Sequence, residues 1–281
     1  MKYFGSCFIF ITMLTSGISY AQQSCCTISS TAKFASFAAE DEFIRAHPIP
    51  APYKAESLAG TMITFPATSG ANSSAYLVTS KKHPNKVILM FHDFWGLNDY
   101  NKSEADLISK ELDVTVCAID LFEGKVPATR DDASKAAQGV VDTRANAIID
   151  GAITYFGKTT RFGMIGWCMG GSWSQQAALR AATQADACVI YYGMPETNLD
   201  KLKELHAPVL GIFGKKDKWI TPDVVSNYQV AMKTAGKRLS IHSYDADHAF
   251  ANPSDPHHDK ASADDANKHA LDFLKRNLKL F

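Results

Sequence analysis

The chain has no excess charge of either sign. Lys plus Arg number 29 and Asp plus Glu number 29 among 281 residues, so the formal net charge is zero. A balanced charge removes the electrostatic argument for a nucleic-acid partner or for an anionic membrane surface. The sequence also has no block of like charges of the kind that forms an acidic or basic tail.

Long apolar runs and dense cysteine are missing as well. No stretch approaches the roughly 20 apolar residues of a membrane helix, and six cysteines are too few for a disulfide scaffold. A Cys-x-x-Cys pair is absent, which argues against a thiol oxidoreductase. The histidines show no metal-ligand spacing, and the segment Asp255 to Asp259 is expected to form a helix cap. We therefore predict no cofactor and no metal site.

What the N-terminus does contain is typical of a secretory signal. Lys2 precedes the apolar run Phe8 to Leu14, and Ser19-Tyr20-Ala21 places small residues before a cleavage site. We predict a signal peptide over residues 1–21 and an exported protein, periplasmic or secreted, with no membrane partner after cleavage. An uncleaved anchor is the alternative, although the run is short for a bilayer.

Residues 22–55 are expected to form an N-terminal extension. Cys25 and Cys26 lie in its Ser/Thr/Ala-rich beginning, which shows no sheet periodicity. In an oxidising compartment this vicinal pair could bond internally, join another chain or stay free, and the sequence does not choose. Pro48-Ile-Pro-Ala-Pro52 marks the stiff end of the segment.

From residue 56 to 281, strand and helix patterns alternate. This order predicts one α/β domain with a mostly parallel sheet of about eight strands, because continuous apolar runs such as Val87 to Phe91 suit strands buried on both faces. Gly70 to Ser74 predicts a hairpin between the first two strands. The expected strands are 61–66, 75–79, 86–91, 114–119, 161–167, 187–192, 209–213 and 238–244. The expected helices are 99–112, 131–156, 171–182, 223–235 and 261–278.

A nucleophile candidate stands between a strand and a helix. Gly166-Trp-Cys168-Met-Gly170 matches a nucleophile elbow with Cys in place of Ser. A tight strand-to-helix turn needs small residues on both sides, and the helix N-terminus favours a thiolate. The following N–H, from Met169, would face a developing oxyanion. A buried structural cysteine beside packing glycines is the alternative.

A cysteine nucleophile needs a base and an orienting acid. In this fold the chain order is nucleophile, acid, base, and Asp217 and His248 each follow a later strand. We predict a triad of Cys168, Asp217 and His248. Asp245 and Asp247 are rivals for the acid, but they lie too close to His248 in sequence to reach around its ring easily.

These residues make the sequence resemble the dienelactone hydrolase family of the α/β-hydrolase fold, from about Thr61 to the C-terminus. The blocks that carry the resemblance are 91–97 (FHDFWGL), 118–122 (AIDLF), 166–171 (GWCMGG), 191–193 (YYG), 214–217 (GKKD) and 247–250 (DHAF). The resemblance implies the same triad, and an oxyanion hole formed by the backbone N–H groups of Phe94 and Met169.

The resemblance also marks two departures near the substrate. Asp93 stands where the family has a Glu that helps to activate the thiol, and it is one methylene shorter. Asn252 stands where dienelactone-cleaving members carry an Arg that holds the substrate carboxylate, and a neutral amide makes no charged pair. Arg130 is the nearest match to a second family arginine, with Arg144 as its rival.

The sequence thus predicts a hydrolase that cleaves an ester or lactone, with an altered substrate-carboxylate site. Four residues are expected to bind the substrate. Trp95 and Trp219 would form apolar walls of the pocket, and Asn252 and Arg130 would contact the substrate's polar groups. We expect a monomer whose partner is a small-molecule ester or lactone. The alternative is a non-catalytic small-molecule binding protein that kept the fold.

Overall fold

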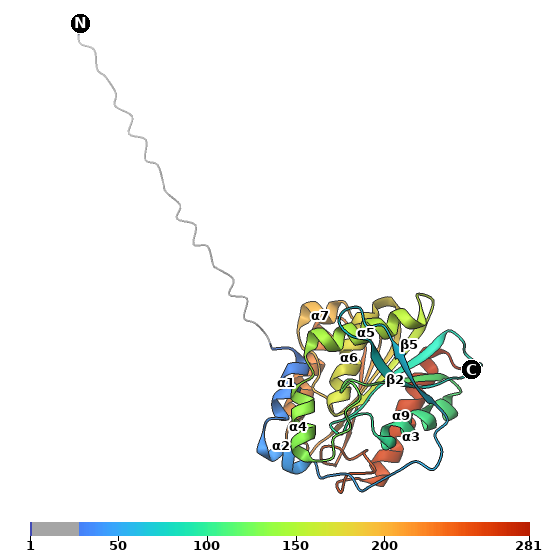
Figure 1. Ribbon diagram of the computed structural model, residues 1–281. Helices are drawn as coiled ribbons and strands as arrows, with labels where there is room; N and C mark the ends of the chain where they lie inside the picture. The colour runs from blue at the N-terminus through green and yellow to red at the C-terminus, as the bar shows by residue number, and fades with distance from the viewer. Residues whose placement is uncertain (2–27) are drawn as a thin grey trace.

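The computed structural model describes Met1 and residues 28–281 (Figure 1). The signal peptide predicted over residues 1–21 and the pair Cys25–Cys26 therefore lie, apart from Met1, outside the described residues. Within those residues, no helix combines the length and the apolar character that crossing a membrane requires.

An eight-stranded sheet forms the centre of the fold, in the order β1-β2-β4-β3-β5-β6-β7-β8. The first two strands pair antiparallel, β2 pairs antiparallel with β4, and all other neighbours are parallel. The predicted mostly parallel α/β sheet is confirmed, and so is the hairpin between the first two strands. The strands are β1 Thr61–Phe65, β2 Ser73–Val78, β3 Lys86–Phe91, β4 Thr115–Ile119, β5 Arg161–Trp167, β6 Ala185–Tyr191, β7 Val209–Gly214 and β8 Leu239–Tyr244.

Helices cover both faces of this sheet, which is why its central strands are apolar throughout. In β3, the five residues from Val87 to Phe91 are all buried. Helices α3 and α9 pack against each other on one side, and α5 and α6 pack together on the other (Figure 1). The helices after β3 are α3 Asp99–Leu112, α4 Arg130–Gln138, α5 Asp142–Phe156, α6 Met169–Ala181, α7 Leu199–Lys203, α8 Pro222–Thr234 and α9 Lys260–Leu278.

The single helix predicted over residues 131–156 is wrong. Two helices, α4 and α5, occupy this segment and are separated by three residues that begin with Gly139. The N–H of Gly139 closes α4 by bonding to the carbonyls of Lys135 and Ala136. The next two residues are Val140 and Val141, whose β-branched side chains favour extended backbone. The short helix α7 was not predicted.

The described part of the N-terminal extension contains two helices. Helices α1 (Ser30–Phe37) and α2 (Asp41–Ala46) lie against α4 and α6 (Figure 1, blue). Hydroxyls of Ser29 and Thr31 donate to Asp142 at 2.7 Å each, and Ser134 donates to the carbonyl of Ala38. The rings of Phe34 and Phe43 are fully buried. The extension is therefore part of the packed domain.

Candidate active site

Cys168 lies on the turn that joins β5 to α6. Its backbone has φ 56° and ψ −121°, a left-handed conformation that a non-glycine residue rarely adopts. The turn closes only because glycines stand two residues away on each side. A Cβ on Gly166 would lie 2.1 Å from the carbonyl oxygen of Gly170, and one on Gly170 would lie 2.2 Å from that of Phe91. The sequence pattern therefore forms the tight elbow expected of it.

The structure brings the three predicted triad residues together from separate loops. His248 Nε2 lies 3.4 Å from Cys168 Sγ, and His248 Nδ1 lies 2.6 Å from Asp217 Oδ2. The other Asp217 oxygen accepts the backbone N–H groups of Trp219 and Ile220 at 2.9 Å each. These bonds fix the carboxylate behind the imidazole. The rival Asp245 instead forms an exposed ion pair with Lys216.

Burial and mutual charge shift the ionisation of this triad. Burial alone would lower the pKa of His248, but the Asp217 carboxylate outweighs burial and raises the pKa above its ordinary value. Burial would likewise raise the pKa of Asp217, and His248 with two backbone N–H groups lowers it instead. The pKa of Cys168 is raised by burial, against the opposing effect of His248. Burial thus favours the thiol form of Cys168 over the expected thiolate, and Asp217 makes the His248 imidazole more basic.

The other residues predicted around the thiol are also close to it. Phe94, Trp95 and Asp93 line a small cavity of about 10 Å³ together with Cys168, and Met169 begins α6 directly after the thiol. Asp93 uses its two oxygens elsewhere, because Oδ1 accepts the Trp95 N–H at 2.9 Å and Oδ2 accepts Asn252 Nδ2 at 3.1 Å. Oxyanion binding by Phe94 and Met169 and thiol activation by Asp93 stay predictions.

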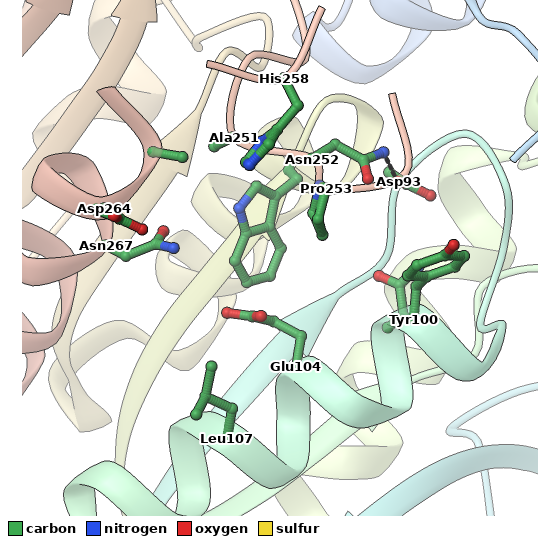
Figure 2. A pocket seen from close by; sticks show the side chains of 13 residues that line it. Asp93, Tyr100, Glu104, Leu107, Ala251, Asn252, Pro253, His258, Asp264 and Asn267 are labelled. Atoms are coloured by element: carbon green, nitrogen blue, oxygen red, sulfur yellow. Dashed lines mark hydrogen bonds between the residues drawn. The ribbon is translucent and has the colours of Figure 1, made fainter. Parts of the chain in front are cut away.

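A larger cavity of about 250 Å³ adjoins the small one, and the two share Asp93 and Asn252. Figure 2 shows Tyr100, Glu104 and Leu107 of α3 on one side of it and residues of α9 on the other. Burial raises the pKa of Glu104 to about 7. The full lining is Asp93, Tyr100, Asn101, Glu104, Leu107, Trp167, Ala251, Asn252, Pro253, His258, Ala263, Asp264 and Asn267.

Three acidic side chains but no Lys or Arg belong to that described lining. Arg130, expected near the substrate, lies instead at the start of α4, where its Nε donates to the carbonyl of His47 at 3.1 Å. Its rival Arg144 pairs with Glu123 and with the carbonyl of Ser69. The Arg130 guanidinium is thus bound to the N-terminal extension. A contact between Arg130 and the substrate stays a prediction.

Trp219, the other predicted wall, packs against the extension as well. Its ring lies 5.1 Å from that of Phe43 and 5.8 Å from that of His248, measured between centroids. A cavity of about 340 Å³ opens beside it and is lined by Glu42, Arg45 and His248 among others. Trp219 therefore borders a different cavity from the two that Asp93 and Asn252 line.

His47 lies at the site although the sequence did not predict it there. The sequence offered it no partner at ligand spacing, yet its Nε2 lies 3.8 Å from Cys168 Sγ across 121 residues of chain. Its Nδ1 bonds to the carbonyl of Phe43 at 2.7 Å. Burial and the nearby His248 lower the pKa of His47 to about 3. The sequence contained only one hint, which is that His47 directly precedes the proline-rich segment Pro48 to Pro52.

Three further groups of residues have local structural roles, and the helix cap expected in the segment Asp255 to Asp259 is confirmed. His92 lies behind the loop after β3, with Nδ1 bonded to the Asp93 carbonyl and Nε2 accepting the Leu121 N–H. Asp259 caps α9 by accepting the Ser262 N–H. Cys117 and Cys188 are buried free thiols in strands, and burial raises the pKa of each to about 12.

Comparison with known proteins identifies relatives of this chain. The model of the dienelactone hydrolase family matches residues 73–278. Protein usf of Aquifex pyrophilus is 26% identical over 232 residues, which cover 78% of this chain and 99% of that protein. A carboxymethylenebutenolidase of Pseudomonas sp. (strain P51) is 24% identical over 237 residues, covering 76% of this chain and 94% of that protein.

Solved structures agree on the fold. A dienelactone hydrolase-like promiscuous phosphotriesterase from metagenomic libraries superposes with a TM-score of 0.65 at 18% identity, covering 78% of this chain and 99% of that one. A dienelactone hydrolase from Anabaena variabilis gives a TM-score of 0.53 at 16% identity, covering 78% and 99%. The eight-stranded sheet with its flanking helices is thus the architecture of these hydrolases.

Proposed function

The chain belongs to the dienelactone hydrolase family, and we propose that it hydrolyses an ester or lactone through Cys168, His248 and Asp217. The observation that carries the proposal is the continuous contact from Sγ to Nε2 at 3.4 Å and from Nδ1 to the carboxylate at 2.6 Å. A thiol on a strained elbow, next to an imidazole fixed by an acid, is the arrangement of an activated nucleophile.

The chemistry follows from this geometry. Cys168 Sγ attacks the carbonyl carbon while its proton moves to His248 Nε2, and the backbone N–H groups of Phe94 and Met169 stabilise the oxyanion. Collapse of the tetrahedral intermediate breaks the carbon–oxygen bond, and His248 protonates the leaving alkoxide. Water then attacks the thioester, giving its proton to His248, and the carboxylic acid product leaves as the thiol reforms. Asp217 holds the imidazole orientation throughout.

We further propose that the preferred substrate is neutral or positively charged near the scissile bond. The cavity of about 250 Å³ beside the triad presents the carboxyl groups of Asp93, Glu104 and Asp264. Asn252 supplies an amide where the family places a substrate-binding Arg. An anionic substrate would meet acidic groups there without a compensating cation, so its binding would be penalised.

An ester panel tests both parts of the proposal. Aryl esters whose acyl chains end in a neutral amide, a carboxylate or an ammonium group differ in charge at nearly equal size. We expect hydrolysis of the neutral and ammonium esters at a kcat/KM at least about 10-fold above that of the carboxylate ester. Cys168→Ala should abolish turnover of all three. Faster cleavage of the carboxylate ester would overturn the substrate proposal.

One observation favours a second candidate, the non-catalytic binding protein. Cys168 is only 2% exposed and borders a cavity of about 10 Å³ that His47 helps to close. An activated-acyl probe separates the two functions, because an active thiol becomes covalently labelled in the folded protein. A thiol that stays unlabelled, with every ester uncleaved, supports the binding function.

A further inference from the structure

Three metal-binding atoms converge at the nucleophile, two of them from the triad and one from the N-terminal extension. Nε2 of His47, Sγ of Cys168 and Nε2 of His248 all lie within 4.8 Å of one another, and all three residues are buried. The two sulfur–nitrogen distances are 3.4 and 3.8 Å. A tetrahedral Zn²⁺ with ordinary bond lengths to sulfur and nitrogen separates those atoms by about 3.6 Å.

Both imidazoles are oriented as metal-bound histidines are. His47 Nδ1 bonds to the carbonyl of Phe43 at 2.7 Å, and a carbonyl can only accept, so the proton is on Nδ1 and the Nε2 lone pair faces the sulfur. His248 Nδ1 bonds to the Asp217 carboxylate at 2.6 Å, which likewise leaves Nε2 facing the sulfur. A carbonyl or carboxylate behind the second ring nitrogen is the usual support of a histidine ligand.

An unsatisfied hydroxyl borders the same space. Tyr192 is 1% exposed, and its hydroxyl has no hydrogen-bond partner among residues 28–281. Tyr192 lines the small cavity with His47 and Cys168. Buried hydroxyls without a partner are rare in folded proteins, because desolvation costs free energy that a hydrogen bond normally restores. A water on the fourth position of an ion would give this hydroxyl its partner.

We propose that His47, Cys168 and His248 bind a Zn²⁺ ion, with the fourth position open to water. The ligand set of one thiolate and two imidazoles suits Zn²⁺, whose open sites keep three protein ligands and one water. Binding replaces the thiol proton, and any proton on His248 Nε2, with the ion and releases it to solvent. The ion occupies the lone pairs that hydrolysis needs, so it reversibly blocks the nucleophile.

The extension is what makes this site possible, since the triad alone supplies two ligands. Arg130 Nε holds the His47 carbonyl at 3.1 Å. The His47 ring packs against Phe43 at 4.1 Å and Phe94 at 4.8 Å between centroids. The apolar rings keep bulk solvent away from the three protein ligands, which strengthens their bonds to the ion. The extension thus gives the hydrolase a metal-dependent resting state.

Direct metal binding tests the site without relying on activity. The full chain is freed of metal with a chelator and titrated with Co²⁺, whose thiolate bond gives a charge-transfer absorption in the near ultraviolet. Zn²⁺ affinity is then measured by competition with a chromophoric chelator. Cys25 and Cys26 could bind metal themselves. Metal binding at the proposed site is therefore taken as the amount bound by wild type minus the amount bound by Cys168→Ala.

We expect Cys168→Ala to lose one equivalent of metal together with the charge-transfer band. His47→Gln should weaken Zn²⁺ binding by more than about 100-fold, beyond the loss that changes outside the ligand set usually cause. His206→Gln, at an exposed histidine, should bind as wild type does. Undiminished binding in His47→Gln, or in Cys168→Ala, overturns the proposal.

The outcome is distinguishable from that of the proposed hydrolase function. A protein that binds one Zn²⁺ through Cys168 but cleaves no ester keeps the metal site and refutes the hydrolysis proposal. A protein that cleaves esters but shows no Cys168-dependent metal binding does the reverse. Where both hold, sub-stoichiometric Zn²⁺ should inhibit hydrolysis in proportion to occupancy, and a chelator should restore the rate.

Discussion

Asn252 Nδ2 donates a hydrogen bond to Asp93 Oδ2 at 3.1 Å, joining two loops that are 159 residues apart in the chain. Both residues line both the small cavity at Cys168 and the larger one beside it, and Figure 2 shows the pair at the larger cavity. The partner of the Asp93 carboxyl group in this bond is the uncharged amide of Asn252. Asp93 therefore presents to the larger cavity a carboxyl group whose pKa is raised by burial, and no Lys or Arg of the described lining pairs with it.

Replacing that neutral partner by a cation should change substrate preference. In Asn252→Arg, we expect kcat/KM for a carboxylate-bearing aryl ester to rise relative to the neutral ester by about 10-fold, which is about 1.4 kcal/mol of transition-state binding. Asn252→Gln keeps the amide and is the matched control, with an unchanged ratio. Parallel steady-state assays on both esters measure it, and an equal ratio in Asn252→Arg would refute a charge effect at this position.

The Asp217–His248 bond gives a second prediction. Asp217→Asn should lower kcat/KM for aryl esters by at least about 100-fold, because the amide no longer stabilises the imidazolium or fixes its tautomer. Asp245→Asn, at an exposed carboxylate paired with Lys216, is the matched control and should leave the rate within about 2-fold. Circular dichroism verifies that both variants fold. Retained activity in Asp217→Asn would remove Asp217 from the mechanism.

Much of this site was predictable because its residues follow strands. Cys168, Asp217 and His248 each come directly after a strand pattern, and in a parallel sheet the loops at one edge meet. His47 was not predictable, since it belongs to no strand and its neighbour Cys168 is 121 residues away. Only the packing of α2 against the finished domain brings its ring to the sulfur.

The boundary between α4 and α5 was not predicted, for a different reason. Residues 131–156 keep a helical pattern across Gly139, and one glycine costs a helix only about 1 kcal/mol. The following pair Val140–Val141, together with hydrogen bonds that close α4 at Gly139, ends the helix there. The sequence contained that signal, but its effect depends on tertiary packing of both helices.

Glu104 should make stability depend on pH. Burial raises its pKa from 4.5 to about 7 in the folded protein, so between those values the native state holds a proton that the unfolded chain has released. The free energy of unfolding therefore falls as pH rises through this window. Glu104→Gln should be more stable than wild type at pH 8, on the order of 2 kcal/mol, and nearly equal at pH 4.5.

Denaturant unfolding of wild type and Glu104→Gln across that pH range measures the effect. Glu111→Gln, on the exposed face of the same helix, provides the control and should follow the wild-type curve at every pH. A constant difference between Glu104→Gln and wild type from pH 4.5 to 8 would show that the carboxyl group does not change its charge there.

The elbow glycines should be intolerant of even one methyl group. In Gly170→Ala the new Cβ would lie 2.2 Å from the Phe91 carbonyl oxygen and 2.4 Å from that of His92, so β3 and α6 must separate. We expect a loss of about 3 kcal/mol in unfolding free energy, with loss of Cys168 labelling. Gly139→Ala, where the nearest atom is a carbonyl oxygen at 3.1 Å, should change stability by less than about 1 kcal/mol. Thermal melts of the two variants measure the contrast, and equal melting temperatures would refute the steric account of the elbow.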